Sequence, residues 1–172
     1  KKDIHFKKGI SCSGCHGGNS KSEDMDIAMS KGNGFKGVMK GDDISLACAK
    51  CHADNETMKK YGSKLPTDQF ELLQKSVHGK LSTTGKERIV QCITCHKAHG
   101  IVSVNNPASP VYPLNVPKTC SQCHSNAVYM RSYNPSLPID QYEKYITSFH
   151  GILNRKGDSK TAECASCHGS HE

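Results

Sequence analysis

One short pattern, Cys-x-x-Cys-His, occurs five times in the 172 residues and uses all ten cysteines of the chain. The copies are Cys12, Cys15, His16; Cys48, Cys51, His52; Cys92, Cys95, His96; Cys120, Cys123, His124; and Cys164, Cys167, His168. Two thiols at this spacing add to the vinyl groups of a porphyrin, and the adjacent histidine ligates its iron. The sequence therefore predicts five covalently bound haem c groups.

Three other uses of paired cysteines fit the pattern less well. Structural zinc normally takes two Cys-x-x-Cys pairs for each metal, and this chain has an odd number of pairs. A disulfide scaffold gives no reason for a histidine after every second cysteine. A thioredoxin-like redox site needs one pair rather than five. Haem attachment is the interpretation that explains both the cysteines and the histidines.

Five further histidines lie outside the motifs, and their number equals the number of motifs. They are His5, His78, His99, His150 and His171. A single spare histidine is more often solvated or packed than a ligand, but here the count predicts two axial imidazoles for every iron. Methionine is the competing sixth ligand. Met58 and Met130 occupy equivalent places in the repeat described below, although methionine more often fills gaps in a core.

Chain reach partly limits which histidine serves which iron. His96 and His99 are three residues apart, so their Cα atoms are separated by at most about 11 Å. We therefore expect His99, and likewise His171, to ligate a haem other than that of its own motif. The expected pairings are His5 with the Cys12/Cys15 haem, His99 with Cys48/Cys51, His78 with Cys92/Cys95, His171 with Cys120/Cys123, and His150 with Cys164/Cys167. Two alternatives stay open, ligands that cross between repeats and ligands from a neighbouring subunit.

The chain also contains an internal repeat of 72 residues. Residues 48–99 and 120–171 align without a gap and are identical at 19 of 52 positions. Each repeat carries two attachment motifs and two spare histidines. We therefore divide the chain into an N-terminal single-haem segment (1–43), a first dihaem repeat with its linker (44–115) and a second dihaem repeat (116–172). The haems are expected to join all three into one domain.

One helix in each repeat is predicted from its apolar spacing. The first covers about 68–78 and stops at Gly79, and the second covers about 140–150 and stops at Gly151. Each of these helices ends on a spare histidine, and the absent Cβ of the following glycine is expected to leave room for a porphyrin edge. The proline-rich run 100–117 is expected to connect the two repeats.

The composition leaves little material for an ordinary core, with 35% hydrophobic residues, 6% aromatic residues and no tryptophan. The predicted fold class is therefore mainly α with much irregular coil, around a core of five stacked haems. The apolar runs are too short for a transmembrane span. The start, Lys1-Lys2-Asp3, has no apolar region, so no signal peptide is expected in this form.

The formal charge of +7 does not by itself indicate an anionic partner. Adding the propionates and irons of five haems brings the charge to about +2 when oxidised and about −3 when reduced. No basic stripe interleaved with aromatic residues is present, so nucleic-acid binding is not expected. Lys31, Lys36 and Lys40 in the glycine-rich run 31–41 form either a docking patch for an acidic redox partner or, as we favour, a solvated loop.

The pattern Ser-x-His-Gly followed by Cys-x-x-Cys-His-x-x-His, at 76–99 and 148–171, resembles the multihaem c-type cytochromes of respiratory bacteria. The number of motifs is similar to that of the pentahaem donors to nitrite reductase and of halves of the periplasmic decahaem cytochromes. The resemblance implies a periplasmic or extracellular location, low-potential bis-histidine haems and electron transfer between redox proteins in anaerobic respiration. One departure is Asn19, which follows the first motif where His99 and His171 follow others.

About 34 residues for each haem leave little protein between cofactors, so the sequence predicts an electron carrier in which neighbouring haems exchange electrons. An enzyme needs an iron with an open position, and five spare histidines leave none. No motif has lysine in place of its histidine, which is the mark of one type of nitrite reductase. The alternative to a carrier is a homo-oligomer or an extracellular cytochrome filament, in which the terminal haems of successive copies stack.

Overall fold

The computed structural model of the chain describes residues 2–80 and 88–171. Within these residues short helices are joined by turns and coil, which confirms the predicted helical class. The helices are α1 (Ile4–Lys7), α2 (Cys12–His16), α3 (Met25–Ala28), the 3-10 helix η1 (Lys31–Asn33), α4 (Asp42–His52), α5 (Asn55–Lys60), α6 (Gln69–Lys75), α7 (Cys92–His96), α8 (Val116–His124), α9 (Ala127–Tyr133), α10 (Gln141–Thr147), α11 (Phe149–Arg155) and α12 (Cys164–His168). Each Cys-x-x-Cys-His motif forms either a whole helix or the last turn of a longer one.

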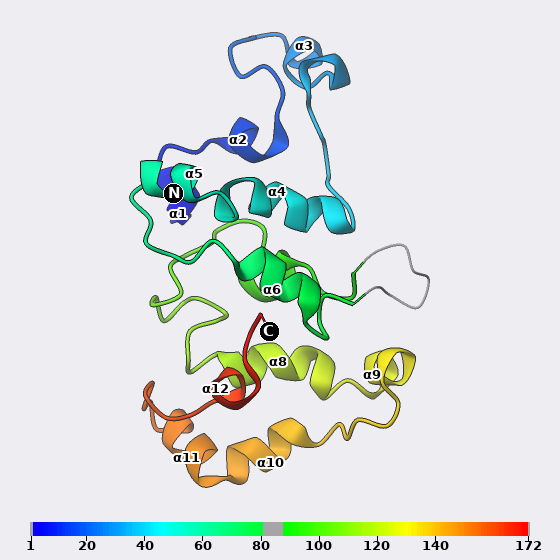
Figure 1. Ribbon diagram of the computed structural model, residues 1–172, viewed down its shortest axis with the longest axis vertical. Coiled ribbons are helices and arrows are strands. Elements are labelled where there is room, and N and C mark those ends of the chain that lie inside the picture. The colour runs from blue at the N-terminus through cyan, green and yellow to red at the C-terminus, as the bar shows by residue number, and fades with distance from the viewer. Residues whose placement is uncertain (1, 81–87, 172) are drawn as a thin grey trace.

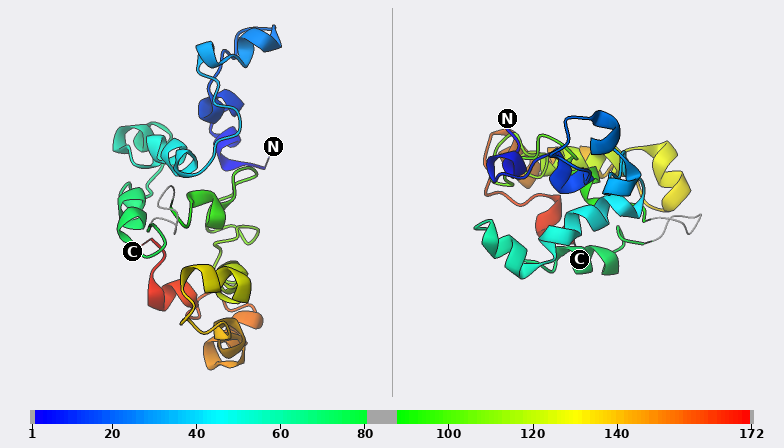
Figure 2. Two further views of the ribbon diagram at one scale, coloured as in Figure 1. Left: turned by 90° about the vertical axis from the view of Figure 1, so that its right-hand side faces the viewer. Right: turned by 90° about the horizontal axis from the view of Figure 1, so that it is seen from above.

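The molecule is elongated, with α3 and α2 at one end of its long axis and the second repeat at the other (Figure 1). The motif helices α2, α4, α8 and α12 follow one another down this axis in chain order. Figure 2 shows the same arrangement from the side, with the segment that contains α3 projecting beyond α2 at the upper end. The attachment motifs are therefore spread along the molecule rather than gathered at one point.

The polypeptide has almost no hydrophobic core of its own. Among the described residues the buried apolar side chains are those of Ala49, Met58, Leu73, Pro117 and Met130. The chain exposes 11854 Å², whereas a compact monomer of 18.8 kDa exposes about 8,300 Å². Large apolar side chains remain uncovered, including Phe149, which is 72% exposed. The chain thus exposes more surface than a compact domain of its mass, and large apolar side chains form part of that surface.

The helices recur at the 72-residue spacing. α6 and α10 begin and end at equivalent positions, and so do α7 and α12, while α5 and α9 begin at equivalent positions. Packing recurs too, since α4 contacts α7 and α8 contacts α12. Met58 on α5 and Met130 on α9 are the equivalent buried methionines, each 6% exposed. Their burial agrees with a packing role.

The two predicted helices form, but they end earlier than expected. α6 ends at Lys75, so His78 lies in the turn that follows it rather than on the helix. α10 ends at Thr147, and Ser148 then caps a new helix, α11, whose first turn contains His150. In both repeats the serine hydroxyl, from Ser76 or Ser148, stops the first helix by bonding to its last turn.

The role expected for the two glycines is also wrong. A Cβ at Gly79 would lie 1.8 Å from the carbonyl oxygen of Leu73, and a Cβ at Gly151 would lie 1.9 Å from that of Tyr145. The glycines therefore permit the chain to pass close to the preceding helix, where a side chain does not fit. Gly151 lies inside α11 and does not end a helix.

The N-terminal segment and the connector are both held by specific hydrogen bonds. The Ile4 N–H donates to the Ile101 carbonyl (2.7 Å), and the Ile101 N–H donates to the Asp3 carboxylate (2.9 Å). The connector is a series of turns, because residues 106, 109, 112 and 115 each donate a backbone N–H to the carbonyl three residues earlier. The N-terminal segment is thus fastened to the end of the first repeat.

A search of the described residues for a helix long and apolar enough to cross a bilayer finds none.

Candidate functional site

Eight of the ten histidines meet in four pairs of imidazole rings. The pairs, with the distance between ring centroids, are His5 and His52 (5.8 Å), His16 and His99 (6.1 Å), His78 and His124 (6.1 Å), and His96 and His171 (6.1 Å). Each pair joins the histidine of one attachment motif to one spare histidine. The structure thus pairs the two kinds of histidine as the count in the sequence led us to expect.

The spacing of the pairs matches two ligands on opposite sides of one metal ion. Metal–imidazole bonds of about 2.0 Å on each side place the two ring centroids about 6 Å apart. In the His5–His52 pair the two Nε2 atoms face each other at 3.5 Å. Among the described residues no group of three or more histidine, cysteine, aspartate or glutamate side chains is placed to hold a metal ion. A porphyrin supplies four equatorial nitrogens and needs only two axial ligands, so the paired imidazoles fit it.

The pairing differs from the one expected on chain reach. The sequence assigned His5 to the first motif and His99 to the second, whereas the structure places His5 beside His52 and His99 beside His16. Those two assignments are wrong because the fold brings His5 on α1 beside the last residue of α4, and brings His99, which follows α7, beside the last residue of α2.

The assignments of His78 to the third motif and of His171 to the fourth motif are also wrong. His78 faces His124 and His171 faces His96, so the two repeats exchange histidines. Crossing between repeats is the alternative that the sequence left open. His99 and His171 lie beside histidines of other motifs, and their ligation of those haems stays a prediction. The pairing of His150 with His168 stays a prediction.

Contacts at the other ring nitrogen orient three of these histidines. His16 donates from Nδ1 to the Gly37 carbonyl (2.9 Å), and the Nδ1 atom of His5 lies 3.3 Å from the Asp3 carboxylate. His171 Nδ1 lies 3.3 Å from the Ser170 hydroxyl. A hydrogen bond at Nδ1 fixes the ring and leaves Nε2 free for a metal. Asp3 and Gly37 could not be predicted from the sequence, because their roles depend on the path of the folded backbone.

Burial favours the neutral form of the paired imidazoles. Desolvation lowers the pKa of His52 and of His96, with a smaller contribution from the neighbouring histidine in each case. Burial lowers the pKa of His78, His124 and His171 as well. A neutral imidazole is the form that binds a metal, so these surroundings suit axial ligands.

The first cysteines of two motifs meet within each repeat. The Cys48 and Cys92 thiols lie close together, and their interaction raises the pKa of Cys48 and lowers that of Cys92 to about 6. The Cys120 and Cys164 thiols interact in the equivalent way, which lowers the pKa of Cys164 to about 7. In both repeats this contact places the two attachment points side by side.

The second cysteines of two motifs approach each other between the repeat units. The pKa of Cys15 is raised by burial and then by the nearby Cys51 thiol, and the pKa of Cys95 is raised by burial and then by the nearby Cys123 thiol. The contacts along the chain therefore alternate, first between second cysteines and then between first cysteines. They link the five motifs in the order of the sequence.

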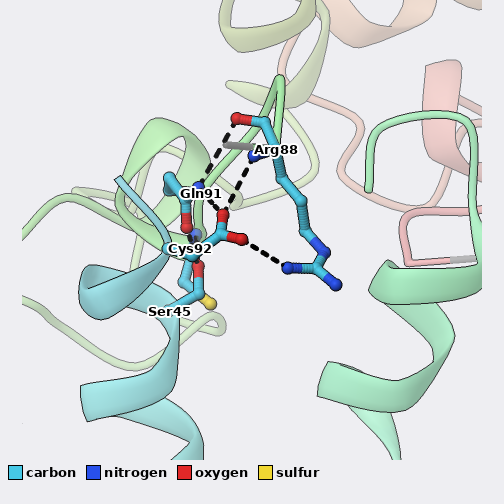
Figure 3. Close-up of polar contacts among 5 residues, drawn as sticks. Ser45, Arg88, Gln91 and Cys92 are labelled. Atoms are coloured by element: carbon cyan, nitrogen blue, oxygen red, sulfur yellow. Dashed lines mark hydrogen bonds and ion pairs between the residues drawn. The ribbon is translucent and has the colours of Figure 1, made fainter. Parts of the chain in front are cut away.

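A polar cluster, which we call the α4–α7 tie, fixes two motif helices in the first repeat (Figure 3). The Asp42 carboxylate on α4 accepts from the backbone N–H and the guanidinium of Arg88, and from the amide of Gln91. Ser45 donates to the Gln91 side chain and accepts from the Cys92 N–H (3.0 Å). The backbone hydrogen bond from Arg88 is the largest cause of the lowered pKa of Asp42. The tie sets Cys92 against the helix that ends in Cys48, Cys51 and His52.

In the glycine-rich run 31–41 the lysine side chains and the backbone have different surroundings. Lys31, Lys36 and Lys40 are exposed, which agrees with a solvated loop. The backbone of the run folds over the first motif, where the Lys36 N–H donates to the His16 carbonyl. Its contribution to the site is therefore made by backbone atoms rather than by the lysine side chains.

Comparison with known families gives one match. A family model described as cytochrome c3 matches residues 4–125, which includes four of the five motifs. Neither the search of curated proteins nor that of solved structures found a match.

Proposed function

The chain belongs to the cytochrome c3 family, and from this premise we propose that it is a pentahaem electron-transfer protein with one haem c at each Cys-x-x-Cys-His motif. Members of the family bind c-type haems covalently, carry electrons between redox partners and are typically periplasmic or extracellular. The proposal adds the number of haems, their two axial imidazoles and their order along the molecule.

The observation that carries the proposal is the set of four imidazole pairs at 5.8 to 6.1 Å. A histidine packed only for structure has no reason to face a second imidazole at the distance of a shared metal. Here that spacing recurs four times, and each time one partner follows a Cys-x-x-Cys pair. His150 and His168 complete the set as the proposed ligands of the fifth iron.

The residues of the chain position the cofactors, while the iron in each haem supplies the redox chemistry by cycling between its ferric and ferrous forms. The cysteines fix the porphyrin edges, and contacts between cysteines of successive motifs bring those edges together. The paired histidines hold each ring from both faces, which favours low potentials. Electrons would then pass between motifs in the order of the sequence.

The two ends of this series are the parts most open to a partner. Cys12 and Cys15 of the first motif and Cys167 of the last are exposed, whereas both cysteines of each of the three middle motifs are partly buried. Redox proteins would exchange electrons at the terminal haems, in the anaerobic respiration that the resemblance implies. The lysines outside the site balance haem propionates rather than form a basic docking face.

The direct test is to count and characterise the haems. Intact mass and the pyridine haemochrome spectrum should give five covalent haems for each chain. The ferric protein should be entirely low-spin, and its spectrum should not change when cyanide or nitrite is added. Fewer than five haems, or a high-spin iron that binds these ligands, would contradict the proposal.

A filament is the second function that the exposed terminal motifs favour. If successive copies stack their first and last haems, the same series of motifs would continue from chain to chain. Electron microscopy of the purified protein should then show polymers, and sedimentation velocity should show large assemblies. A single monomer peak across a range of concentrations would leave the discrete carrier as the function.

A further inference from the structure

The α4–α7 tie contains one polar atom that the described residues do not satisfy. Arg88 uses its backbone N–H and one terminal guanidinium nitrogen on Asp42, and its side chain is 25% exposed. Its Nε atom is buried and has no hydrogen-bond partner among the described residues. A buried donor without a partner is unfavourable, so such atoms are rare unless a bound group satisfies them.

The surroundings of this donor limit what that group can be. Both acceptor atoms of the Asp42 carboxylate are already occupied, by Arg88 and Gln91. The same network reaches the backbone N–H of Cys92, and the Cys92 thiol contacts Cys48. The unpaired N–H therefore lies at the junction of the second and third attachment motifs. The charged acceptors that a haem brings to such a junction are its propionate carboxylates.

On this basis, and resting on the proposed haem content, we propose that Arg88 is a cofactor-binding residue whose Nε–H donates to a propionate of a haem at this junction. A guanidinium suits the task because its donors lie in one plane and match the geometry of carboxylates. Asp42 orients the guanidinium from one side, so the Nε–H is held in place before the cofactor binds.

The second repeat provides the matched comparison. The position equivalent to Arg88 is Lys160, whose side chain has no Nε–H of this kind, and the position equivalent to Asp42 is Leu114. The proposed contact therefore belongs to the first repeat alone. Of the two related junctions, only the one between motifs two and three should depend on the residue at this position.

The experiment compares Arg88→Gln, Arg88→Lys, Asp42→Asn and Lys160→Gln by redox-difference infrared spectroscopy and by potentiometric titration of the haem absorbance. In Arg88→Gln we expect one propionate carboxylate band to move. We also expect one midpoint potential to fall, with about a tenfold rise in the ferric-to-ferrous ratio of that haem at a fixed potential. The direction follows because an unpaired negative charge stabilises ferric iron. Lys160→Gln should leave that band and that potential unchanged.

Two of the variants distinguish a direct contact between Arg88 and the propionate from an indirect effect through the α4–α7 tie. Asp42→Asn keeps one oxygen acceptor for Arg88 and keeps the Nε–H, so the band should move less than in Arg88→Gln. Arg88→Lys keeps the charge but lacks the planar donor, so the band should move even if Arg88→Gln does not fold. A band that stays in both Arg88 variants, or one that moves equally in Asp42→Asn, would overturn the proposal. The haem count is measured on every variant, so a failure of the haem assignment is recognised separately.

Discussion

The two repeats bring their first cysteines together by different chemistry. In the first repeat the contact between Cys48 and Cys92 is supported by the polar α4–α7 tie. In the second, Pro117 is buried at the position of Ser45, and Glu163, which forms a capping box as Gln91 does, stands at the position of Gln91. The side chains that hold the helices differ, yet the sulfur contact is the same. This is what we expect if the relative placement of the two cofactors is the feature that function requires.

Among the described residues, each repeat also has one buried side-chain polar atom without a hydrogen-bond partner, at different places. In the first it is the Nε of Arg88, and in the second it is the hydroxyl of Ser125, which directly follows His124. The equivalent positions in the other repeat are Lys160 and Ala53. The two repeats therefore share the arrangement of their helices, while the polar contacts of their side chains are specific to each repeat.

The largest expected effect tests what the repeats share. Gly79→Ala and Gly151→Ala would each place a Cβ within 2 Å of a backbone carbonyl in the preceding helix. Each variant should therefore lose roughly 3 kcal/mol of unfolding free energy, measured by chemical denaturation. Gly32→Ala is the matched control, because nothing lies within 4 Å of its added Cβ. If only one of the two variants lost unfolding free energy, the turns at Gly79 and Gly151 would not be equivalent.

The next effect should appear in the first repeat only. Asp42→Ala removes the acceptor of three hydrogen bonds and leaves Arg88 and Gln91 without their partner. We expect a loss of about 2 kcal/mol in unfolding free energy. Leu114→Ala, at the equivalent position, removes apolar contacts but no ion pair, so its loss should not depend on pH.

The pH dependence of this effect has a definite sign. The pKa of Asp42 is lowered from its ordinary value of 3.8, first by the hydrogen bond from the Arg88 N–H and then by that from Gln91. Its contribution to stability is therefore complete above that ordinary value and is lost as the pH falls through the lower, folded-state pKa. Denaturation of the wild type and Asp42→Ala should give curves that converge at low pH. Curves that stay parallel would show that the charge of Asp42 does not stabilise the tie.

A smaller effect should appear in the second repeat. Glu163 accepts a hydrogen bond from the Ala165 N–H (2.7 Å) and also bonds to Ser166 as a capping box at the start of α12. Glu163→Ala should cost about 1 kcal/mol, again measured by denaturation. Glu163→Gln keeps an acceptor and should restore most of the loss. Without that restoration, the cap would not be the reason for the effect.

The sequence predicted the parts of this structure that depend on local spacing. The motif helices, the start of α6 and α10 and the separation of His99 and His171 from their own motifs all follow from residues near one another in the chain. The pairing of the histidines does not follow from local spacing. The number of residues between two histidines can exclude a pairing, but it does not select one partner from those that remain. His78 meets His124, a histidine of the other repeat, and no spacing within either repeat predicts that contact.

The polar contacts at the site were harder to foresee for the same reason. Asp3 is close to His5 in sequence, but its carboxylate is fixed by the Ile101 N–H, almost a hundred residues away. Gly37 contributes a carbonyl, which any residue type has, so its identity gives no signal. The Gly79 and Gly151 positions were recognised as special, but the group they accommodate is a backbone carbonyl rather than a porphyrin edge.

The last prediction concerns the electronic state of the irons and needs no change in stability. The imidazole planes of successive motifs alternate, with angles of 20°, 87°, 1° and 76° for motifs one to four. Two parallel imidazoles interact with the same iron d orbital, so the energy of that orbital moves away from that of the second π-type d orbital. Two perpendicular imidazoles interact with one orbital each, so the two orbital energies stay nearly equal. Electron paramagnetic resonance of the ferric protein should therefore show two classes of low-spin signal.

Single variants assign these classes to the repeats. The first motif of each repeat has the perpendicular pair, so His52 and His124 should belong to one class and His96 to the other. Replacing the spare partner, His5→Met or His78→Met, should remove intensity from the perpendicular class alone, while His171→Met should reduce the parallel class. A haem count on each variant ensures that lost intensity reflects the changed ligand rather than a lost haem. Loss from the wrong class would show that the irons do not alternate along the chain as the imidazole planes do.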